Sequence, residues 1–241
     1  MPVSERLVII PTYNEKENIR DILSHVLRLQ PMFDILVVDD GSPDGTAALV
    51  KSVRGEHPGR VHLIERSGKL GLGTAYIAGF KWAIAAGYDF IFEMDADFSH
   101  DPNDLIRLFE ACANGGADMS VGSRYVRGGQ VKDWAWHRIF LSFTASLYVR
   151  MILWLGVRDT TAGFVCYRRQ VLESLPLDEI RFVGYAFQIE MKYRVRLAGF
   201  RIAEVPITFV DRVKGKSKMS SGIFQEAIIG VLKMRVSIAR P

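Results

Sequence analysis

Two aspartates, Asp95 and Asp97, follow an apolar run, Phe90-Ile91-Phe92, that predicts a buried strand. Side chains at positions i and i+2 of a strand share a face, so the two carboxylates would repel each other unless a positive group sits between them. Mg²⁺ is usually held by one or two carboxylates together with substrate phosphates. The pair therefore predicts a divalent-cation site, and the competing interpretation is a pair of solvated loop aspartates.

Strands and helices alternate through the first half of the chain and predict the scaffold for these aspartates. Apolar runs at 7–10, 35–38 and 61–64 precede the run before Asp95, and helical periodicity occurs at 17–29, 46–53 and 73–86. This pattern is typical of an α/β fold with a mainly parallel sheet and helices on both faces. Ligands bind beyond the carboxyl ends of such strands, so the turns 11–15, 39–45 and 95–97 are expected to converge.

The second half of the chain is less regular. Residues 119–125 are interpreted as a strand leaving the sheet, and 222–238 as a final amphipathic helix that docks on the domain or lies in a bilayer interface. Between them we expect a helix at 136–155, a turn and strand at 160–168, a helix at 186–197 and an extended segment at 201–209.

Composition narrows the class of protein. Of the 241 residues 49% are hydrophobic, which excludes a largely disordered chain. The net charge of +4 favours anionic partners such as phosphates, nucleic acid or a membrane surface, but no nucleic-acid motif is recognisable. Two cysteines are too few for a disulfide framework or a zinc site and indicate a reducing compartment. The first residues do not resemble a signal peptide, and the most apolar stretch, 139–157, is interrupted by Arg150.

Two further turns carry residues with two possible roles. In 39–42, Gly41 would supply a positive φ for the turn, whereas Asp40 would accept hydrogen bonds from a nucleobase or ribose. The glycines of 68–73 do not follow the G-x-G-x-x-G order. They form either a backbone-permissive loop near a ligand, with Lys69 on a phosphate, or a plain helix-entry turn.

A polar stripe crosses the otherwise apolar helix expected at 136–155. It consists of residues four apart: Arg138, Ser142, Ser146 and Arg150. The stripe would hold an anionic head group, since arginine donates two parallel hydrogen bonds to a phosphate. A partly buried core helix with one wet edge explains the same periodicity equally well.

Several motifs in the same order resemble one enzyme family. They are Pro11-Thr12-Tyr13-Asn14-Glu15, Asp40-Gly41-Ser42-Pro43-Asp44-Gly45-Thr46, Gly68–Tyr76, Met94–His100, Gly122–Tyr125, Thr161–Phe164 and the segment from Arg212 to Lys218. Together they resemble the inverting glycosyltransferases of family 2, in the branch of the polyprenol-phosphate mannose synthases. The resemblance implies a single GT-A type, Rossmann-like domain over 1–241. Residues 1–125 would bind the nucleotide sugar, and 126–241 would bind the acceptor and lie near the membrane.

The resemblance also implies roles for individual residues. GDP-mannose would be held through its guanosine by Pro11, Tyr13, Glu15, Val38 and Asp40. The metal and diphosphate would lie at Asp95, Ala96 and Asp97. A glutamine that reaches the metal in some relatives is replaced here by Ser99, a shorter and weaker ligand. The acceptor phosphate would be cradled by Arg124, Arg138 and Ser142, and the donor phosphates covered by a loop with Arg212 and Lys218.

Three other side chains are weighed against this site. Glu190 stands where related enzymes often have a catalytic carboxylate, but a phosphate acceptor is already ionised and needs no base. We expect Glu190 to orient a substrate or an arginine instead, and we assign no catalytic role to His100 or His137. Lys214, Lys216 and Lys218 indicate a basic loop or a solvated charge run.

These observations and the resemblance lead to one expected function. The chain would transfer mannose from GDP-mannose to a polyprenyl phosphate with Mg²⁺ or Mn²⁺, at the cytoplasmic face of a membrane. It would be held there peripherally or by a separate membrane subunit, and would bind no nucleic acid. The alternatives are a related enzyme that uses UDP-glucose or another donor, a hydroxyl-acceptor transferase that needs Glu190 as base, and a nucleotide-binding subunit without activity.

Overall fold

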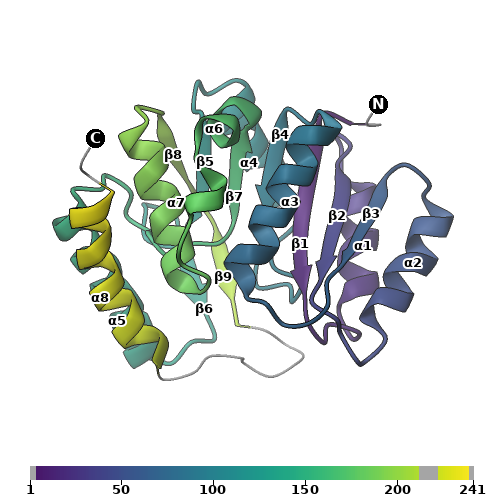
Figure 1. Cartoon of the computed structure of the whole chain (residues 1–241), viewed down its shortest axis with the longest axis horizontal. Helices are drawn as coiled ribbons and strands as arrows, with labels where there is room; N and C mark the ends of the chain where they lie inside the picture. Colours follow the sequence, from purple (N-terminus) through teal and green to yellow (C-terminus); the bar gives the residue numbers. More distant parts are fainter. Residues whose placement is uncertain (1–3, 212–221, 239–241) are drawn as a thin grey trace.

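A computed structural model describes residues 4–211 and 222–238 of the chain (Figure 1). Its strands are β1 (Arg6–Thr12), β2 (Asp34–Asp39), β3 (Val61–Glu65), β4 (Phe90–Glu93), β5 (Met119–Ser123), β6 (Gln130–Lys132), β7 (Val165–Arg168), β8 (Ile202–Pro206) and β9 (Thr208–Val210). Its helices are α1 (Ile19–Arg28), α2 (Thr46–Glu56), α3 (Leu72–Ala86), α4 (Asp104–Ala113), α5 (Trp136–Leu153), α6 (Arg169–Ser174), α7 (Tyr185–Leu197) and α8 (Gly222–Ser237), with a 3-10 turn at Leu177–Glu179.

Seven strands form one sheet in the order β3-β2-β1-β4-β7-β5-β8. β3, β2, β1 and β4 are mutually parallel, β7 runs antiparallel to both β4 and β5, and β5 is parallel to β8. The prediction of a mainly parallel α/β sheet is confirmed. The interpretation of 119–125 as a strand leaving the sheet was wrong, because β5 lies inside the sheet between β7 and β8. A short apolar strand carries no signal of its neighbours or direction.

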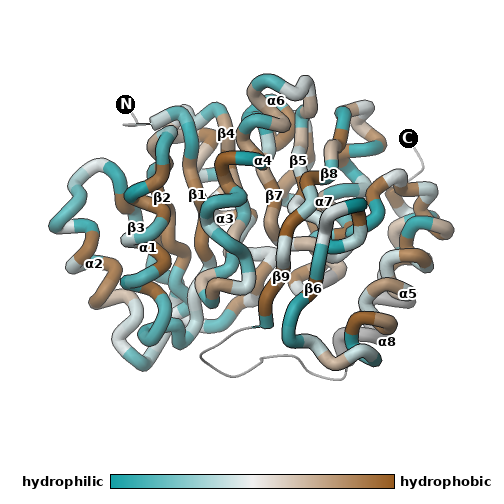
Figure 2. The backbone as a smooth tube through the Cα atoms, turned by 180° about the vertical axis from the view of Figure 1, so that it is seen from behind, coloured by the Kyte–Doolittle hydropathy of each residue, from teal (hydrophilic) through white to brown (hydrophobic). Residues whose placement is uncertain are grey.

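Helices cover both faces of the sheet, as the continuous apolar strands predict. Alternate residues of β1 point to opposite sides: Val8 and Ile10 pack with α1, α2 and α4, whereas Leu7 and Ile9 pack with α3, α6 and α7. Each such fully buried aliphatic side chain contributes about 1.5–3 kcal/mol. The backbone tube shows this pattern as brown strands between mixed helices (Figure 2).

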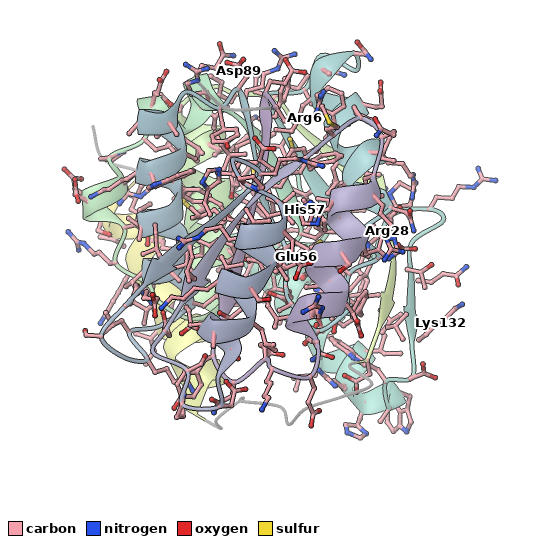
Figure 3. All side chains as sticks on the ribbon, turned by 90° about the vertical axis from the view of Figure 1, so that its right-hand side faces the viewer. Arg6, Arg28, Glu56, His57, Asp89 and Lys132 are labelled. Carbon is pink, nitrogen blue, oxygen red and sulfur yellow. The ribbon has the colours of Figure 1, made fainter. Side chains whose placement is uncertain are left out.

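The three polar turns meet at the carboxyl edge of the sheet, as expected. The Asp40 amide donates to the Thr12 carbonyl over 2.9 Å, and the Asn14 amide donates to Ser42 Oγ over 2.9 Å. The Met94 amide donates to the Ile9 carbonyl over 3.2 Å, which joins the third turn to β1. In the side view, Arg6 and Asp89, which begin or precede strands, lie at the other end of the molecule (Figure 3).

A third cluster of buried apolar residues joins α5, α7 and α8 at the end of the molecule opposite α2 (Figure 1). Val231 and Met234 of α8 are fully buried in this cluster, together with Val149 and Leu153 of α5. The last helix therefore docks on the protein through one of its sides, and contact of its other side with a bilayer stays a prediction. A two-stranded parallel sheet of β6 and β9 lies next to the start of α5. Within 4–211 and 222–238, no helix is both long enough and apolar enough to span a bilayer.

Candidate active site

The Asp95–Asp97 turn begins where β4 ends at Glu93. Asp97 is buried, and its Oδ1 accepts a hydrogen bond of 3.0 Å from the Ser99 amide across Phe98, which has a φ of +59°. The Asp95 side chain is 40% exposed, and its amide donates to His100 Nδ1 over 3.4 Å. The turn thus holds two carboxylates close together at the sheet edge, with Asp95 open to solvent.

The donor set at this turn fits a hard divalent cation. Within the described residues, no group of three or more His, Cys, Asp or Glu side chains is arranged to hold a metal. Two carboxylates alone do not make a zinc site, but they suit Mg²⁺ or Mn²⁺, which would complete its shell with substrate phosphates and water. Ser99 is buried, and its carbonyl accepts a hydrogen bond of 3.3 Å from the Val210 amide.

His100 packs against aromatic rings beside the turn. Its ring stacks on Phe164 with centroids 4.7 Å apart and meets the edge of Phe209 at 5.4 Å. Burial lowers the pKa of His100 to about 4, so the imidazole is neutral in the fold. These contacts show that His100 packs beside the turn as a neutral ring, whereas His137, at the start of α5, is exposed.

Asp40 is clamped by an arginine that the sequence analysis missed. Arg66 Nε and Nη2 lie 2.6 and 2.5 Å from Asp40 Oδ1, and the Leu70 amide donates to Asp40 Oδ2 over 3.1 Å. Arg66 also donates to Thr74 Oγ1 over 2.8 Å, which fixes the glycine turn. β2 and β3 pair in parallel with Asp39 opposite Glu65, so Arg66 follows at the level of Asp40. A basic residue just after a neighbouring strand was the available signal.

Asp39 supports the same edge from within. Thr12 Oγ1 donates to Asp39 Oδ1 over 2.8 Å, and Ser42 donates to this carboxylate through both its hydroxyl and its amide. Gly41 has a φ of +68°, as expected for the turn. Asp44 accepts hydrogen bonds from the amide and hydroxyl of Thr46 at the start of α2. The positive φ expected at Gly41 is confirmed, and the nucleoside interpretation of Asp40 stays a prediction.

The residues expected at the guanosine are distributed around this edge. Lys69 Nζ lies 5.3 Å from the centroid of the Tyr13 ring, so the glycine turn and the first turn are adjacent. Glu15 accepts a hydrogen bond from the Asn18 side chain. Val38 is fully buried and pairs with Pro11, so its side chain belongs to the core. Arg212 and Lys218 lie outside the described residues, as do Lys214 and Lys216.

The glycine turn serves as a helix entry. Gly71, with a φ of +102°, precedes the first residue of α3. A Cβ on Gly73 would come within 2.7 Å of the Phe182 carbonyl oxygen and 2.8 Å of the Phe187 ring. These glycines therefore allow α3 to approach the segment before α7, and the predicted phosphate contact of Lys69 stays a prediction.

Arg124 is buried in a bidentate ion pair. Its Nε and Nη2 donate to the two carboxylate oxygens of Asp159 over 2.7 and 2.6 Å, and Nη2 also donates to Thr161 Oγ1 over 3.0 Å. Asp159 is fully buried. The arginine was expected to cradle a phosphate, but these contacts show that it also joins β5 to the loop before β7.

Arg138 is placed differently, on the first turn of α5. Its Nη1 lies 3.0 Å from Asp211 Oδ2, and its guanidinium lies 3.8 Å from the centroid of Trp134. Its side chain is 35% exposed. Ser142, one turn on, is half-buried, whereas Ser146 is buried and accepts a hydrogen bond from Thr160. The polar stripe is therefore buried at Ser146, which fits the core interpretation there, and partly exposed at Arg138 and Ser142.

The carboxylate turn and Arg138 are connected through β9. Ser99 accepts the hydrogen bond from Val210, and the next residue, Asp211, pairs with Arg138. Phe209 of the same strand contacts His100, and its ring lies 5.4 Å from the guanidinium of Arg124. β9 thus brings both arginines next to the turn, although they are distant in sequence.

The contacts of Glu190 do not support a role as a general base. Its Oε1 accepts from Arg194 Nε over 2.8 Å, and its Oε2 accepts from the amides of Arg181 and Phe182. The side chain is fully buried. Of the roles considered for Glu190, the structure shows the orientation of an arginine.

A family model described as glycosyl transferase family 2 matches residues 7–175 of the chain. The chain belongs to glycosyl transferase family 2. Polyprenol monophosphomannose synthase from Mycolicibacterium smegmatis is 50% identical over 230 residues, 95% of this chain and 86% of that protein. Undecaprenyl-phosphate mannosyltransferase from Micrococcus luteus is 48% identical over 94% of this chain and 92% of that protein.

Solved structures confirm the fold of this glycosyltransferase. Glucosyl-3-phosphoglycerate synthase from Mycobacterium tuberculosis, crystallised with Mn²⁺, UDP and glucosyl-3-phosphoglycerate, superposes with a TM-score of 0.67 over 95% of this chain and 78% of its own. Sequence identity is 20%, so the likeness shows the fold alone. The expected GT-A type α/β fold is therefore confirmed.

A buried polar network supports the active-site edge of this glycosyltransferase, and the sequence analysis missed it. Glu93, the last residue of β4, accepts hydrogen bonds from Tyr167 and from the Gln188 side chain. Lys192 donates to the carbonyls of Ala162 and Gln188. Burial raises the pKa of Glu93 to about 7 and lowers that of Lys192 to about 8. The network ties the base of the carboxylate turn to α7 and to the loop that holds Arg124.

Proposed function

We propose that this glycosyltransferase transfers mannose from GDP-mannose to a polyprenyl phosphate. Two relatives near 50% identity that cover most of the chain are named for mannose transfer to polyprenol or undecaprenyl phosphate, which supports this substrate pair. The observation that carries the proposal is the link through β9 between the carboxylate turn and Arg138. In this proposal, a site for a cation and diphosphate would lie beside a cationic site for a second phosphate.

The reaction needs little covalent chemistry from the protein. An oxygen of the lipid phosphate attacks the anomeric carbon of mannose, a new C–O bond forms with inversion, and the bond to GDP breaks. The acceptor oxygen is ionised at neutral pH, so no general base is required, in agreement with the contacts of Glu190. Asp95 and Asp97 would hold Mg²⁺ or Mn²⁺, which stabilises the charge on the leaving diphosphate.

The remaining residues would position the two substrates. Tyr13, Lys69 and the Arg66–Asp40 pair lie together at the edge where the nucleotide would bind, with Pro11 and Glu15 on the same turn. Arg138 and Ser142 would hold the acceptor phosphate, and Arg124 would shape that site from its buried ion pair. In this arrangement residues 1–125 would serve mainly the donor, with Arg124 turned to the acceptor, and 126–241 would serve mainly the acceptor within one domain.

Transfer of labelled mannose from GDP-mannose to a short polyprenyl phosphate tests the proposal. We expect a product that disappears with chelator and returns when Mg²⁺ or Mn²⁺ is added. Calorimetry should show binding of GDP in preference to UDP. Transfer from UDP-glucose without transfer from GDP-mannose would overturn the donor assignment, and full activity in chelator would overturn the metal assignment.

A further inference from the structure

A row of large apolar side chains lies exposed along the outside of α5. The row is Trp136, Phe140, Phe143, Leu147, Met151 and, just after the helix, Trp154. Their exposure runs from 40% at Leu147 to 80% at Trp154. Successive members are three or four residues apart, so they form one stripe over about 27 Å of helix. We call these six residues the α5 stripe.

The α5 stripe is not needed to hold the helix on the protein. The inner side of α5 is packed through Val149 and Leu153, which are buried against α7 and α8, and through Ser146, which is buried beside Thr160. The described part of α8 repeats the pattern: Val231 and Met234 are buried against the protein, whereas Ile229, Leu232 and Val236 are exposed. Both helices lie at one end of the molecule, with hydrophobic stretches visible in each (Figure 2). An apolar surface of this extent marks an interaction site.

The charges around the stripe fit an anionic bilayer. The sequence of α5 contains no Asp or Glu and two arginines. Among the described residues nearby in sequence or on the partner helix, the exposed charged side chains include four basic ones, Lys132, Arg158, Lys233 and Arg235, and one acidic one, Asp133. The side view shows Lys132 at the outer edge of the β6 strand (Figure 3). Basic side chains beside an apolar helix face are typical of helices that lie in the plane of a membrane with anionic lipids.

The positions of the two exposed tryptophans support the same occupant. Trp136 begins α5 and Trp154 follows its last residue, so an indole stands at each end of the stripe. Indole rings are enriched at the level of lipid head groups, because they are apolar with one polar N–H. A helix lying flat in the interface would place both rings at that level.

We propose that α5 and α8 lie in the surface of an anionic bilayer, with the α5 stripe among the lipid head groups and upper acyl chains. This inference rests on the proposed lipid acceptor. Arg138 lies in the first turn of α5, on the other side of the helix from Trp136, so the acceptor phosphate would bind at the end of the stripe with its prenyl chain directed into the bilayer. Membrane contact and acceptor binding thus share one helix.

Vesicle binding by the whole protein tests the membrane contact. The test variant is Trp136→Ser/Trp154→Ser, and the matched control is Met32→Ser, an exposed apolar residue before β2. We expect the protein to sediment with phosphatidylcholine vesicles that contain phosphatidylglycerol, and less so without it. The double variant should bind at least roughly tenfold more weakly, and the control like wild type. Equal binding by the double variant and wild type would overturn the proposal.

Fluorescence separates membrane insertion from binding through another surface. The four tryptophans are Trp82, Trp134, Trp136 and Trp154. Lipids brominated in the upper acyl chain should quench the emission of wild type and of Met32→Ser, but not the emission that remains in the double variant. Vesicle binding without quenching would contradict insertion of the stripe. A wild-type dimer in light scattering that the double variant dissociates would assign the stripe to a second copy instead.

Kinetics with two acceptors distinguishes this inference from the proposed function. For a long polyprenyl phosphate in vesicles, the double variant should show a KM raised roughly tenfold with kcat unchanged. For a ten-carbon prenyl phosphate in solution, it should match wild type. No mannose transfer to either acceptor by wild type would defeat the proposed function, while vesicle binding and quenching would still report on the α5 stripe. An equal loss with both acceptors would overturn the membrane role.

Discussion

Two acidic turns follow parallel strands of the same sheet, yet the fold uses them differently. After β2, both aspartates are buried: Asp39 accepts hydrogen bonds from Ser42, and Asp40 accepts one from Arg66. After β4, Asp97 accepts a hydrogen bond from the Ser99 amide in its own turn, and the side chain of Asp95 is 40% exposed. A carboxylate at the end of a strand forms a structural ion pair where the neighbouring strand is followed by a cationic side chain, as at Asp40. Where the carboxylate faces solvent, as at Asp95, it is a candidate ligand for a metal.

The two arginines of the acceptor side differ in the same way. Arg124 is buried against a fully buried Asp159, whereas the Arg138–Asp211 pair is about one-third exposed on both sides. A buried pair is costly to break from one side, because the remaining charge has no compensation. An exposed pair contributes little to stability and can exchange its partner for a ligand. Substitutions of the buried ion pairs should therefore lower stability, whereas substitutions of the candidate ligand groups should lower activity.

The largest effect is expected at the carboxylate turn. Asp95→Asn or Asp97→Asn should lower mannose transfer roughly a thousandfold, because each removes a charge from the proposed metal site. The free energy of unfolding in urea should stay within about 1 kcal/mol of wild type, since a repelling charge is removed. Asp21→Asn, on an exposed turn of α1, is the matched control and should leave transfer unchanged. Near-normal turnover in both variants would contradict the assignment of Asp95 and Asp97 as metal ligands.

The next largest effect is expected from breaking the Arg66–Asp40 ion pair, and it should lower the free energy of unfolding. Arg66→Met should lower the free energy of unfolding by about 3 kcal/mol, because Asp40 stays buried without its cation. Adding Asp40→Asn should recover part of the loss, so the two effects should not be additive. Urea unfolding of the two single variants and the double variant measures this coupling. Additive losses would show that the pair does not act as a clamp.

A smaller effect is expected from Arg138→Ala, and it should be kinetic. The KM for a short prenyl phosphate should rise roughly tenfold, as expected for the loss of a charged hydrogen bond. The affinity for GDP and the free energy of unfolding should change little, because the pair is partly exposed. Arg124→Ala is the contrasting variant and should lower the free energy of unfolding by about 3 kcal/mol. Equal losses of donor and acceptor binding in Arg138→Ala would contradict its assignment to the acceptor.

The smallest effect should come from Ser99→Ala. Ser99 bonds to Asp97 through its amide and to Val210 through its carbonyl, and alanine keeps both groups. We expect transfer to fall less than about threefold, which is within the cost of one neutral hydrogen bond. Titration of activity with Mn²⁺ should give the same half-saturating concentration as wild type. A clear rise in that concentration would make the Ser99 hydroxyl a metal ligand.

The scaffold of the site was readable from the sequence in its first half. The strands β1 to β4 alternate with helices, which predicts that they are parallel. Parallel strands place their carboxyl ends at one edge of the sheet, so the convergence of the three turns could be predicted. The antiparallel β7 was not readable, because a four-residue apolar strand carries no information on its direction. The position of β5 inside the sheet was missed for the same reason.

The sequence by itself determined which residues could do chemistry and which local elements carry them. Carboxylate spacing, strand alternation and helical periodicity are properties of neighbouring residues, so they survive without the fold. Only the tertiary structure decided which charges are partnered. The pairs Arg66–Asp40, Arg124–Asp159 and Arg138–Asp211 join residues 26, 35 and 73 positions apart. Charge pairing and burial depend on the order of the strands and the paths of the loops. For this reason Asp40 is held in an ion pair with Arg66, whereas the side chain of Asp95 faces solvent.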